Sequence, residues 1–114
     1  MSRRGLGGVT IALVWLLAAC GPRPVVGGVS SRTGPHGRLD VEVVLDNSGG
    51  EGQVALELEL HDPDTGALVL RETREAELRA GPSQRVILPV ELPAAWQGRG
   101  ESLRCRVEAR YPVE

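Results

Sequence analysis

The chain has 114 residues and a formal net charge of −2, with 41% hydrophobic and 25% charged residues. This length allows one domain at most after a targeting segment, and the composition is typical of a folded globular domain. All 13 basic residues are arginines, and they are interleaved with Asp and Glu along the chain. No basic face results, so we expect no binding of nucleic acid.

Residues 1–19 have the three parts of a secretion signal. Arg3 and Arg4 give a positive start, residues 9–17 form an apolar run, and Ala18 and Ala19 supply small residues after it. The run from residue 5 to residue 20 contains three glycines and is shorter than the roughly 20 apolar residues that span a bilayer. The sequence therefore predicts a helical signal peptide over residues 1–19.

The end of this segment, Leu17-Ala18-Ala19-Cys20, resembles the lipobox of bacterial lipoproteins. The resemblance implies that the Cys20 thiol takes a diacylglyceryl group and that the signal is cut between Ala19 and Cys20. The new N-terminus would then receive a further acyl chain such as palmitate, and two or more chains anchor a protein stably. An ordinary cleaved signal, or a short membrane helix, with a chance cysteine is the alternative.

The lipobox also implies a location, which is the bacterial cell envelope. In a Gram-negative organism we expect the outer membrane, facing the periplasm, because Gly21 stands where an Asp favours retention in the inner membrane. In other bacteria the outer face of the cytoplasmic membrane is expected.

Residues 20–35 are rich in Gly, Pro, Ser and Arg, which is typical of a flexible tether. A short first strand over residues 25–33 is possible, because valines interrupt this composition. We place the folded domain at residues 36–114.

Apolar residues alternate with polar ones through most of this domain, as in half-buried antiparallel strands. The expected inward positions are Leu39, Val41, Val43, Leu45, Val54, Leu56, Leu58, Leu60, Val86, Leu88, Val90, Leu92, Leu103, Cys105, Val107, Ala109 and Tyr111. Pro89 indicates an edge strand or a bulge, because proline has no N–H to donate to a ladder. Residues 67–80 are ambiguous, since their composition suits a helix, whereas their alternation favours a bent strand or a strand pair.

Turn sequences rich in Asn, Asp, Pro and Gly separate these segments. The pattern predicts an all-β fold, an antiparallel immunoglobulin-like β-sandwich of about six or seven strands. Residues 41–49, 60–66 and 80–83, together with Trp96, resemble immunoglobulin-like and fibronectin-III-like modules of bacterial surface proteins. Most similar are CARDB-type domains and the sandwich domain of family 2 glycosidases. The resemblance spans residues 36–113 and implies a fold without an activity, because the catalytic barrel of those glycosidases has no counterpart here.

No combination of residues predicts catalysis, a cofactor or a metal site. His36 and His61 lie in the tether region and beside a turn, without a nucleophile pattern around them. Glu57 and Glu59 share one strand face, where they are expected to be solvated. Residues 62–66 resemble a calcium loop superficially, but the third acidic ligand and the distal Glu are missing, so a hairpin turn is expected.

Two features leave alternatives open. Cys105 is expected to point inward as a free thiol that fills space, with an intermolecular disulfide or a redox role as the alternative. Trp96 and Tyr111 could form a recognition patch, although a cap over the open end of the core is the favoured role for Trp96.

We therefore expect a non-catalytic, lipid-anchored envelope protein that acts as a protein-binding or structural accessory module. Its contacts would be the membrane, through Cys20, and an envelope protein. The alternatives are a small-ligand carrier or an enzyme with a loop-built site, which a cavity with convergent polar groups would favour. A structural lipoprotein without a dedicated partner is a third interpretation.

Overall fold

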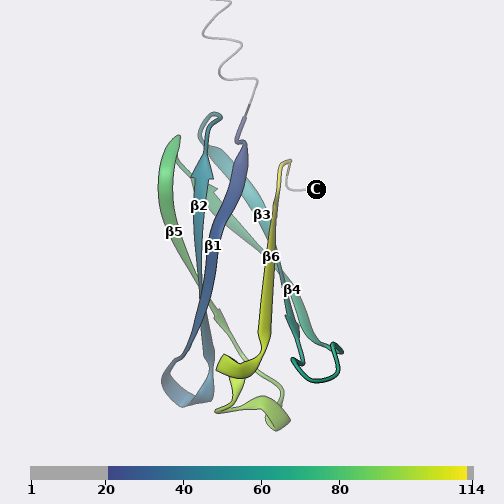
Figure 1. Cartoon of the computed structure of the whole chain (residues 1–114). Coiled ribbons are helices and arrows are strands. Elements are labelled where there is room, and N and C mark those ends of the chain that lie inside the picture. Colours follow the sequence, from purple (N-terminus) through teal and green to yellow (C-terminus); the bar gives the residue numbers. More distant parts are fainter. Residues whose placement is uncertain (1–20, 113–114) are drawn as a thin grey trace, which may run out of the picture.

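The computed structural model describes residues 21–112, which form six strands in two facing sheets (Figure 1). The strands are β1 (Pro24–Thr33), β2 (Leu39–Asn47), β3 (Gly52–His61), β4 (Leu68–Leu78), β5 (Gly81–Val90) and β6 (Arg104–Arg110). The other elements of this range are three 3-10 turns, η1 (Pro35–Gly37), η2 (Ala94–Trp96) and η3 (Gly100–Ser102). The expected all-β, antiparallel, immunoglobulin-like sandwich is confirmed, with six strands. The signal peptide and Cys20 lie outside the described residues.

The two sheets have the strand orders β1-β2-β5 and β4-β3-β6, and every neighbouring pair is antiparallel. We call them sheet A and sheet B. The register defines two ends of the sandwich. The proximal end contains residues 21–24, the turns 48–51 and 79–80, and residues 111–112, whereas the distal end contains residues 34–38, 62–67 and 91–103 (Figure 1). Between residues 21 and 112, no helix has the length and apolar character needed to cross a membrane.

The core lies between the sheets and is almost entirely aliphatic. Its fully buried members include Leu39, Val41, Val43, Leu45, Val54, Leu56, Leu58, Leu60, Leu78 and Val90. Cross-strand pairs such as Leu58 with Val107 continue this packing from β3 into β6. The inward faces predicted for β2 and β3 are therefore correct, and so is the inward face of β5 at Leu88 and Val90.

The strand that the sequence left possible over residues 25–33 is formed, within the segment expected to be a tether. Residues 24–33 form a ten-residue strand that pairs with β2 along its length, so the fold begins well before residue 36. A register shift lies between Val26 and Gly28, which lets both Val26 and Val29 pack against the core although they are three residues apart. Such a bulge breaks the simple alternation that a sequence pattern relies on.

The ambiguous segment is a strand. β4 runs from Leu68 to Leu78 and pairs with β3 over nearly its whole length, which confirms the favoured interpretation and excludes the helix. Pro89 lies in β5, which is an edge strand of sheet A, as its missing N–H predicted.

The sandwich has two flanks. On one flank β1 lies against β6, so the edges of the two sheets cover each other (Figure 1). On the other flank β4 and β5 run beside each other with few backbone contacts. The described fold therefore leaves the β4–β5 flank as its more open side.

Candidate functional site

His61 lies on the outer face of sheet B, and its ring is held by neighbours of its own hairpin. Its Nε2 is 3.0 Å from Glu59 Oε1, and its Nδ1 is 3.2 Å from the carbonyl oxygen of Gly66. Both ring nitrogens are thus engaged in local hydrogen bonds. His36 lies in η1 with φ of 60°, a left-handed conformation that His adopts more readily than most residues. The two histidines therefore lie on separate elements of the distal end, His36 in η1 and His61 at the end of β3.

Glu57 and Glu59 face solvent together with arginines, as expected. The Arg71 guanidinium approaches Glu59 Oε2 at 2.8 Å, and that of Arg110 approaches Glu57 Oε2 at 3.4 Å. Hydrogen bonds from His61 and then Arg71 hold the pKa of the Glu59 carboxyl below its ordinary value. A lowered pKa keeps this carboxylate ionised, which suits a surface ion pair and not a general acid.

Residues 62–66 form the β3–β4 hairpin turn that the sequence favoured over a calcium loop. The Asp62 carboxylate accepts a hydrogen bond from the Asp64 N–H at 2.8 Å, and the Thr65 hydroxyl accepts one from the Ala67 N–H at 3.2 Å. The side-chain oxygens are therefore used within the turn. Among residues 21–112, no three His, Cys, Asp or Glu side chains converge where they could hold a metal ion.

Cys105 is half-buried and unbonded to sulfur. It pairs with Leu60 on the inner face of sheet B, where it packs against the core. Burial raises the pKa of its thiol, and a hydrogen bond with Ser31 opposes that shift. The neutral thiol is a poor nucleophile. Cys105 and His61 both border one depression of about 330 Å³. The His61 side chain, however, lies on the outer face of sheet B with Glu59, so no Cys–His pair is formed.

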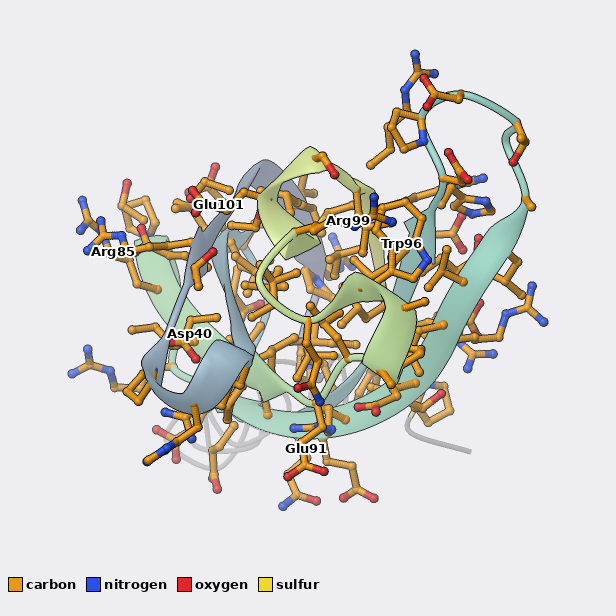
Figure 2. All side chains as sticks on the ribbon, turned by 90° about the horizontal axis from the view of Figure 1, so that it is seen from below. Asp40, Arg85, Glu91, Trp96, Arg99 and Glu101 are labelled. Atoms are coloured by element: carbon orange, nitrogen blue, oxygen red, sulfur yellow. The ribbon has the colours of Figure 1, made fainter. Side chains whose placement is uncertain are left out.

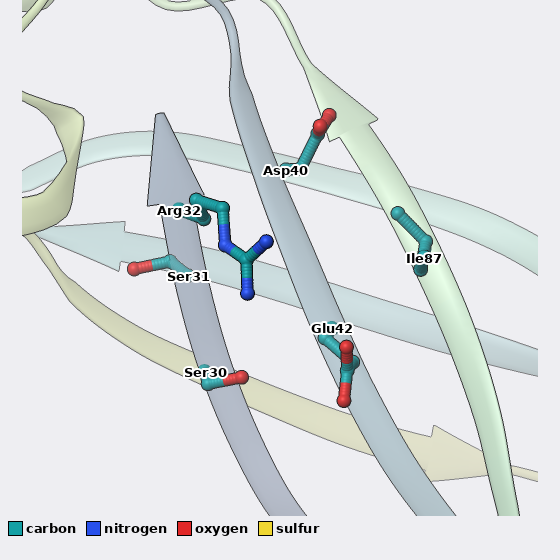
Figure 3. A pocket seen from close by; sticks show the side chains of 6 residues that line it. All are labelled: Ser30, Ser31, Arg32, Asp40, Glu42 and Ile87. Carbon is teal, nitrogen blue, oxygen red and sulfur yellow. The ribbon is translucent and has the colours of Figure 1, made fainter. Parts of the chain in front are cut away.

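The outer face of sheet A carries a shallow depression of about 220 Å³ (Figure 3). Its lining is Ser30, Ser31, Arg32, Asp40, Glu42 and Ile87. This volume is below the range of about 300–1,000 Å³ that small-molecule sites usually have. The Arg38 Nε lies 3.3 Å from Asp40 Oδ1 and the Arg85 Nη1 lies 3.8 Å from Glu42 Oε1, so both carboxylates already have an ion-pair partner.

The distal end holds the only half-buried aromatic side chain among the described residues. Trp96 packs against the core from η2, as the capping interpretation expected, and the Arg99 guanidinium lies over its ring at 4.4 Å (Figure 2). Nearby, the Thr33 hydroxyl donates to Glu101 at 2.7 Å and thereby ties β1 to η3. Cation–π stacking of this kind fixes the Arg99 side chain beside an exposed edge of Trp96.

Tyr111 lies at the opposite end. It follows β6, is 47% exposed, and its ring lies so close to Gly21 that a Cβ there would overlap it. Trp96 precedes β6, and the extended strand between the two aromatic residues holds them apart (Figure 1). The two aromatic residues therefore do not form the single recognition patch that the sequence left open.

The proximal end contains the most tightly specified polar site of the described chain, which the sequence did not predict. Asn47 is 2% exposed and makes four hydrogen bonds. Its Oδ1 accepts from the Arg23 N–H at 2.8 Å and the Gly49 N–H at 3.0 Å. Its Nδ2 donates to the Gly50 carbonyl at 3.0 Å and the Arg79 carbonyl at 2.9 Å. One buried amide thus joins the start of β1 to both proximal turns.

The residues just before β1 are held by the same end. Gly21 and Pro22 are buried, and the Gly50 N–H donates to the Gly21 carbonyl at 2.8 Å. Gly21 has φ of +61°, and Gly49 lies so close that a Cβ on it would overlap the Gly21 carbonyl oxygen. Both positions therefore require glycine. The sequence predicted a turn at Asn47-Ser48-Gly49-Gly50, but it gave no indication that residues 21–23 form hydrogen bonds with this turn.

Comparison with known proteins gives no relative, because no family model, no curated protein and no solved structure matches this chain.

Proposed function

We propose that this protein is a lipid-anchored envelope protein whose sandwich acts as a non-catalytic binding or support module. The anchor is Cys20, at the end of the lipobox-like run Leu17-Ala18-Ala19-Cys20. The observation that carries the proposal is the position of Gly21. This residue directly follows Cys20, and it is already buried and hydrogen-bonded within the fold. The described fold thus already includes the residue that directly follows the predicted lipidation site.

The surface chemistry supports a module that binds another macromolecule more than one that transforms a small molecule. Several charged groups on the outer face of sheet B are used in local pairs, such as Glu59 with Arg71 and Glu57 with Arg110. The Trp96–Arg99 pair at the distal end has the residue types that most often dominate protein interfaces. A partner in the envelope would meet this pair at the end away from Cys20.

The lipid anchor is tested with the two cysteines of the chain. Cys20→Ser should abolish incorporation of an alkyne-tagged fatty acid and release the protein from the membrane fraction. Cys105→Ser is the matched control and should remain labelled and membrane-bound. Labelling that persists in Cys20→Ser, or that is lost in Cys105→Ser, would contradict the anchor.

The binding role is tested in intact cells with a photo-crosslinking residue at single positions. Arg99 and Glu101 place the crosslinker at the distal end, and Glu75 on the outer face of sheet B is the control. We expect one defined crosslinked species from the distal positions and none from Glu75. Uniform crosslinking from all three positions, or none from any, would argue against a dedicated partner at this end.

A further inference from the structure

We propose that the proximal end of the sandwich is a membrane-contact surface that rests on phospholipid headgroups, with the strands standing away from the bilayer. The proposal rests on the function proposed above, because it needs lipid at Cys20. It adds a defined orientation of the protein, which a lipid on a flexible tether would not give.

The first step is the absence of a tether after residue 20. Gly21 and Pro22 are buried, and two backbone–backbone hydrogen bonds and one bond to the Asn47 side chain hold residues 21–23. These are Gly50 N–H to Gly21 carbonyl at 2.8 Å, Ser48 N–H to Arg23 carbonyl at 3.4 Å, and Arg23 N–H to Asn47 Oδ1 at 2.8 Å. The chain is therefore fixed to the sandwich from the first residue after Cys20.

The second step is reach. Consecutive Cα atoms are about 3.8 Å apart, so the Cα of Cys20 lies within one residue of buried Gly21. Acyl chains on that cysteine would be inserted in the bilayer, which brings residue 20 to the headgroup layer. The proximal end cannot then be more than a few ångströms from the same layer.

The third step is the fit of the surface around this point. Tyr111 lies directly on Gly21 and is 47% exposed, and Pro82 is exposed at the start of β5. A tyrosine combines an apolar ring with a polar hydroxyl, which suits the boundary between headgroups and acyl chains.

The charges at the proximal end agree with this contact. Exposed Arg23 and Arg79 are balanced by exposed Asp46 and Glu51. The surface is therefore neither repelled by anionic lipids nor dependent on them. Affinity comes from the acyl chains, and Tyr111 and the proximal turns set the orientation.

The consequence concerns the other end of the protein. β1 has ten residues, and at about 3.3 Å per residue the distal end stands about 33 Å above the membrane. Trp96 and Arg99 are then presented outward, clear of the headgroups (Figure 2). With the proximal end at the membrane, the Trp96–Arg99 pair faces away from the bilayer and is accessible to a protein that is not embedded in it.

Tryptophan fluorescence tests the orientation, because Trp15 precedes the predicted cleavage site and Trp96 is the only other tryptophan. The lipidated protein is reconstituted in vesicles of phosphatidylethanolamine and phosphatidylglycerol that contain a lipid with a headgroup nitroxide. Trp96 should keep its emission. In a Trp96→Phe background, Tyr111→Trp should lose most of its emission, and Pro82→Trp gives a second proximal reporter that does not touch Gly21.

Ile87→Trp in the same background is the control, because Ile87 is 61% exposed on the side of the sandwich. It should remain bright. Quenching of Ile87→Trp as strong as that of the proximal reporters would show a protein lying on its side and would overturn the proposal. So would quenching of Trp96 in the unaltered chain, a readout that needs no substitution.

Vesicle sedimentation separates the two levels of the argument. If the protein sediments with the vesicles but both proximal reporters stay bright, the lipid anchor stands and the contact surface is wrong. If the protein fails to sediment, the anchor itself is wrong and the orientation falls with it.

Discussion

The Arg74 guanidinium donates a hydrogen bond to the carbonyl oxygen of Pro89 at 3.0 Å and so bridges the open flank between β4 and β5. Arg74 also pairs with Glu72, which occupies the same, inward side of β4. Since the Pro89 carbonyl points toward β4, the backbone of residue 89 faces the free edge of β5 and not β2. A proline at this position leaves no N–H exposed at the edge. Inward charges and edge prolines are known means of preventing edge-to-edge pairing of sheets.

Removing these features should expose a strand edge. We expect Arg74→Met with Pro89→Val to self-associate, since the edge gains an N–H and loses the guanidinium that covers it. Sedimentation velocity over a range of concentrations measures this on a chain beginning at Gly21. Arg71→Met, which changes an arginine on the outer face of the same strand, should remain monomeric, and equal association of both variants would argue against an edge effect.

Asn47→Ala should destabilise the proximal end strongly. The substitution leaves the N–H groups of Arg23 and Gly49 and the carbonyls of Gly50 and Arg79 without their partner. Unsatisfied buried groups cost about 1–3 kcal/mol each, and partial hydration of the turns should limit the total to about 2–4 kcal/mol. Thermal or urea unfolding measures the loss. Ser48→Ala, at an exposed neighbouring position, should change the free energy of unfolding by less than about 0.5 kcal/mol.

The sequence predicted the strands in which every inward residue is apolar. β3 is of this kind, and so is β2 from Leu39 to Leu45, before the buried Asn47, and both were assigned with the correct face. β4 stayed ambiguous because Glu72 and Arg74 occupy inward positions on the open flank, which removes the apolar alternation in the middle of the strand. β1 was predicted as a tether with a possible short strand over residues 25–33, because its composition is rich in Gly, Pro, Ser and Arg. The bulge between Val26 and Gly28 also places its apolar residues three apart, which hides the alternation of a strand.

Side-chain placement was less predictable than the strands. Trp96 and Tyr111 flank the last strand in the sequence, and because β6 is extended it places them at opposite ends of the sandwich. The sequence predicted Asn47 only as a turn residue, because two of its hydrogen-bond partners, Arg23 and Arg79, are far from it in the chain. Long-range hydrogen bonds of this type leave no local pattern to recognise.

The Glu59 carboxyl should make stability sensitive to acid. Its pKa is lowered from the ordinary value of 4.5, first by the hydrogen bond with His61 and then by that with Arg71. The native state therefore resists protonation at a pH where the unfolded chain takes up a proton. This contribution is fully present above about 4.5 and is lost as the pH falls through the lower, folded pKa.

The comparison of Glu59→Gln with the unaltered chain measures that contribution. The difference in melting temperature between the two should be largest above about pH 5 and should shrink as the pH falls below the ordinary carboxyl pKa of 4.5. Arg71→Met, which removes one of the two donors, should give a smaller difference of the same sign. A difference that does not vary with pH would show that the two hydrogen bonds do not stabilise the ionised form.

The last prediction compares two neighbours on β3 that face opposite sides of sheet B. Leu58 has no exposed surface, and it lies opposite Val107 on β6 and Glu72 on β4. Truncation of a buried leucine to alanine costs about 2–5 kcal/mol, since the lost transfer free energy adds to the energy of the cavity. Domains of this size have about 5–15 kcal/mol of stability in all, so Leu58→Ala should lower the melting temperature clearly.

Glu57→Ala is the matched control on the outer face. It removes a single contact with Arg110 at 3.4 Å, and exposed ion pairs contribute between about 0 and 1 kcal/mol. The contrast tests register as well as burial, because a slip of one residue would exchange the two faces of the strand. Urea unfolding of both variants on a chain beginning at Gly21 gives the two free energies. A loss at Glu57 equal to that at Leu58 would show that β3 is paired in a different register.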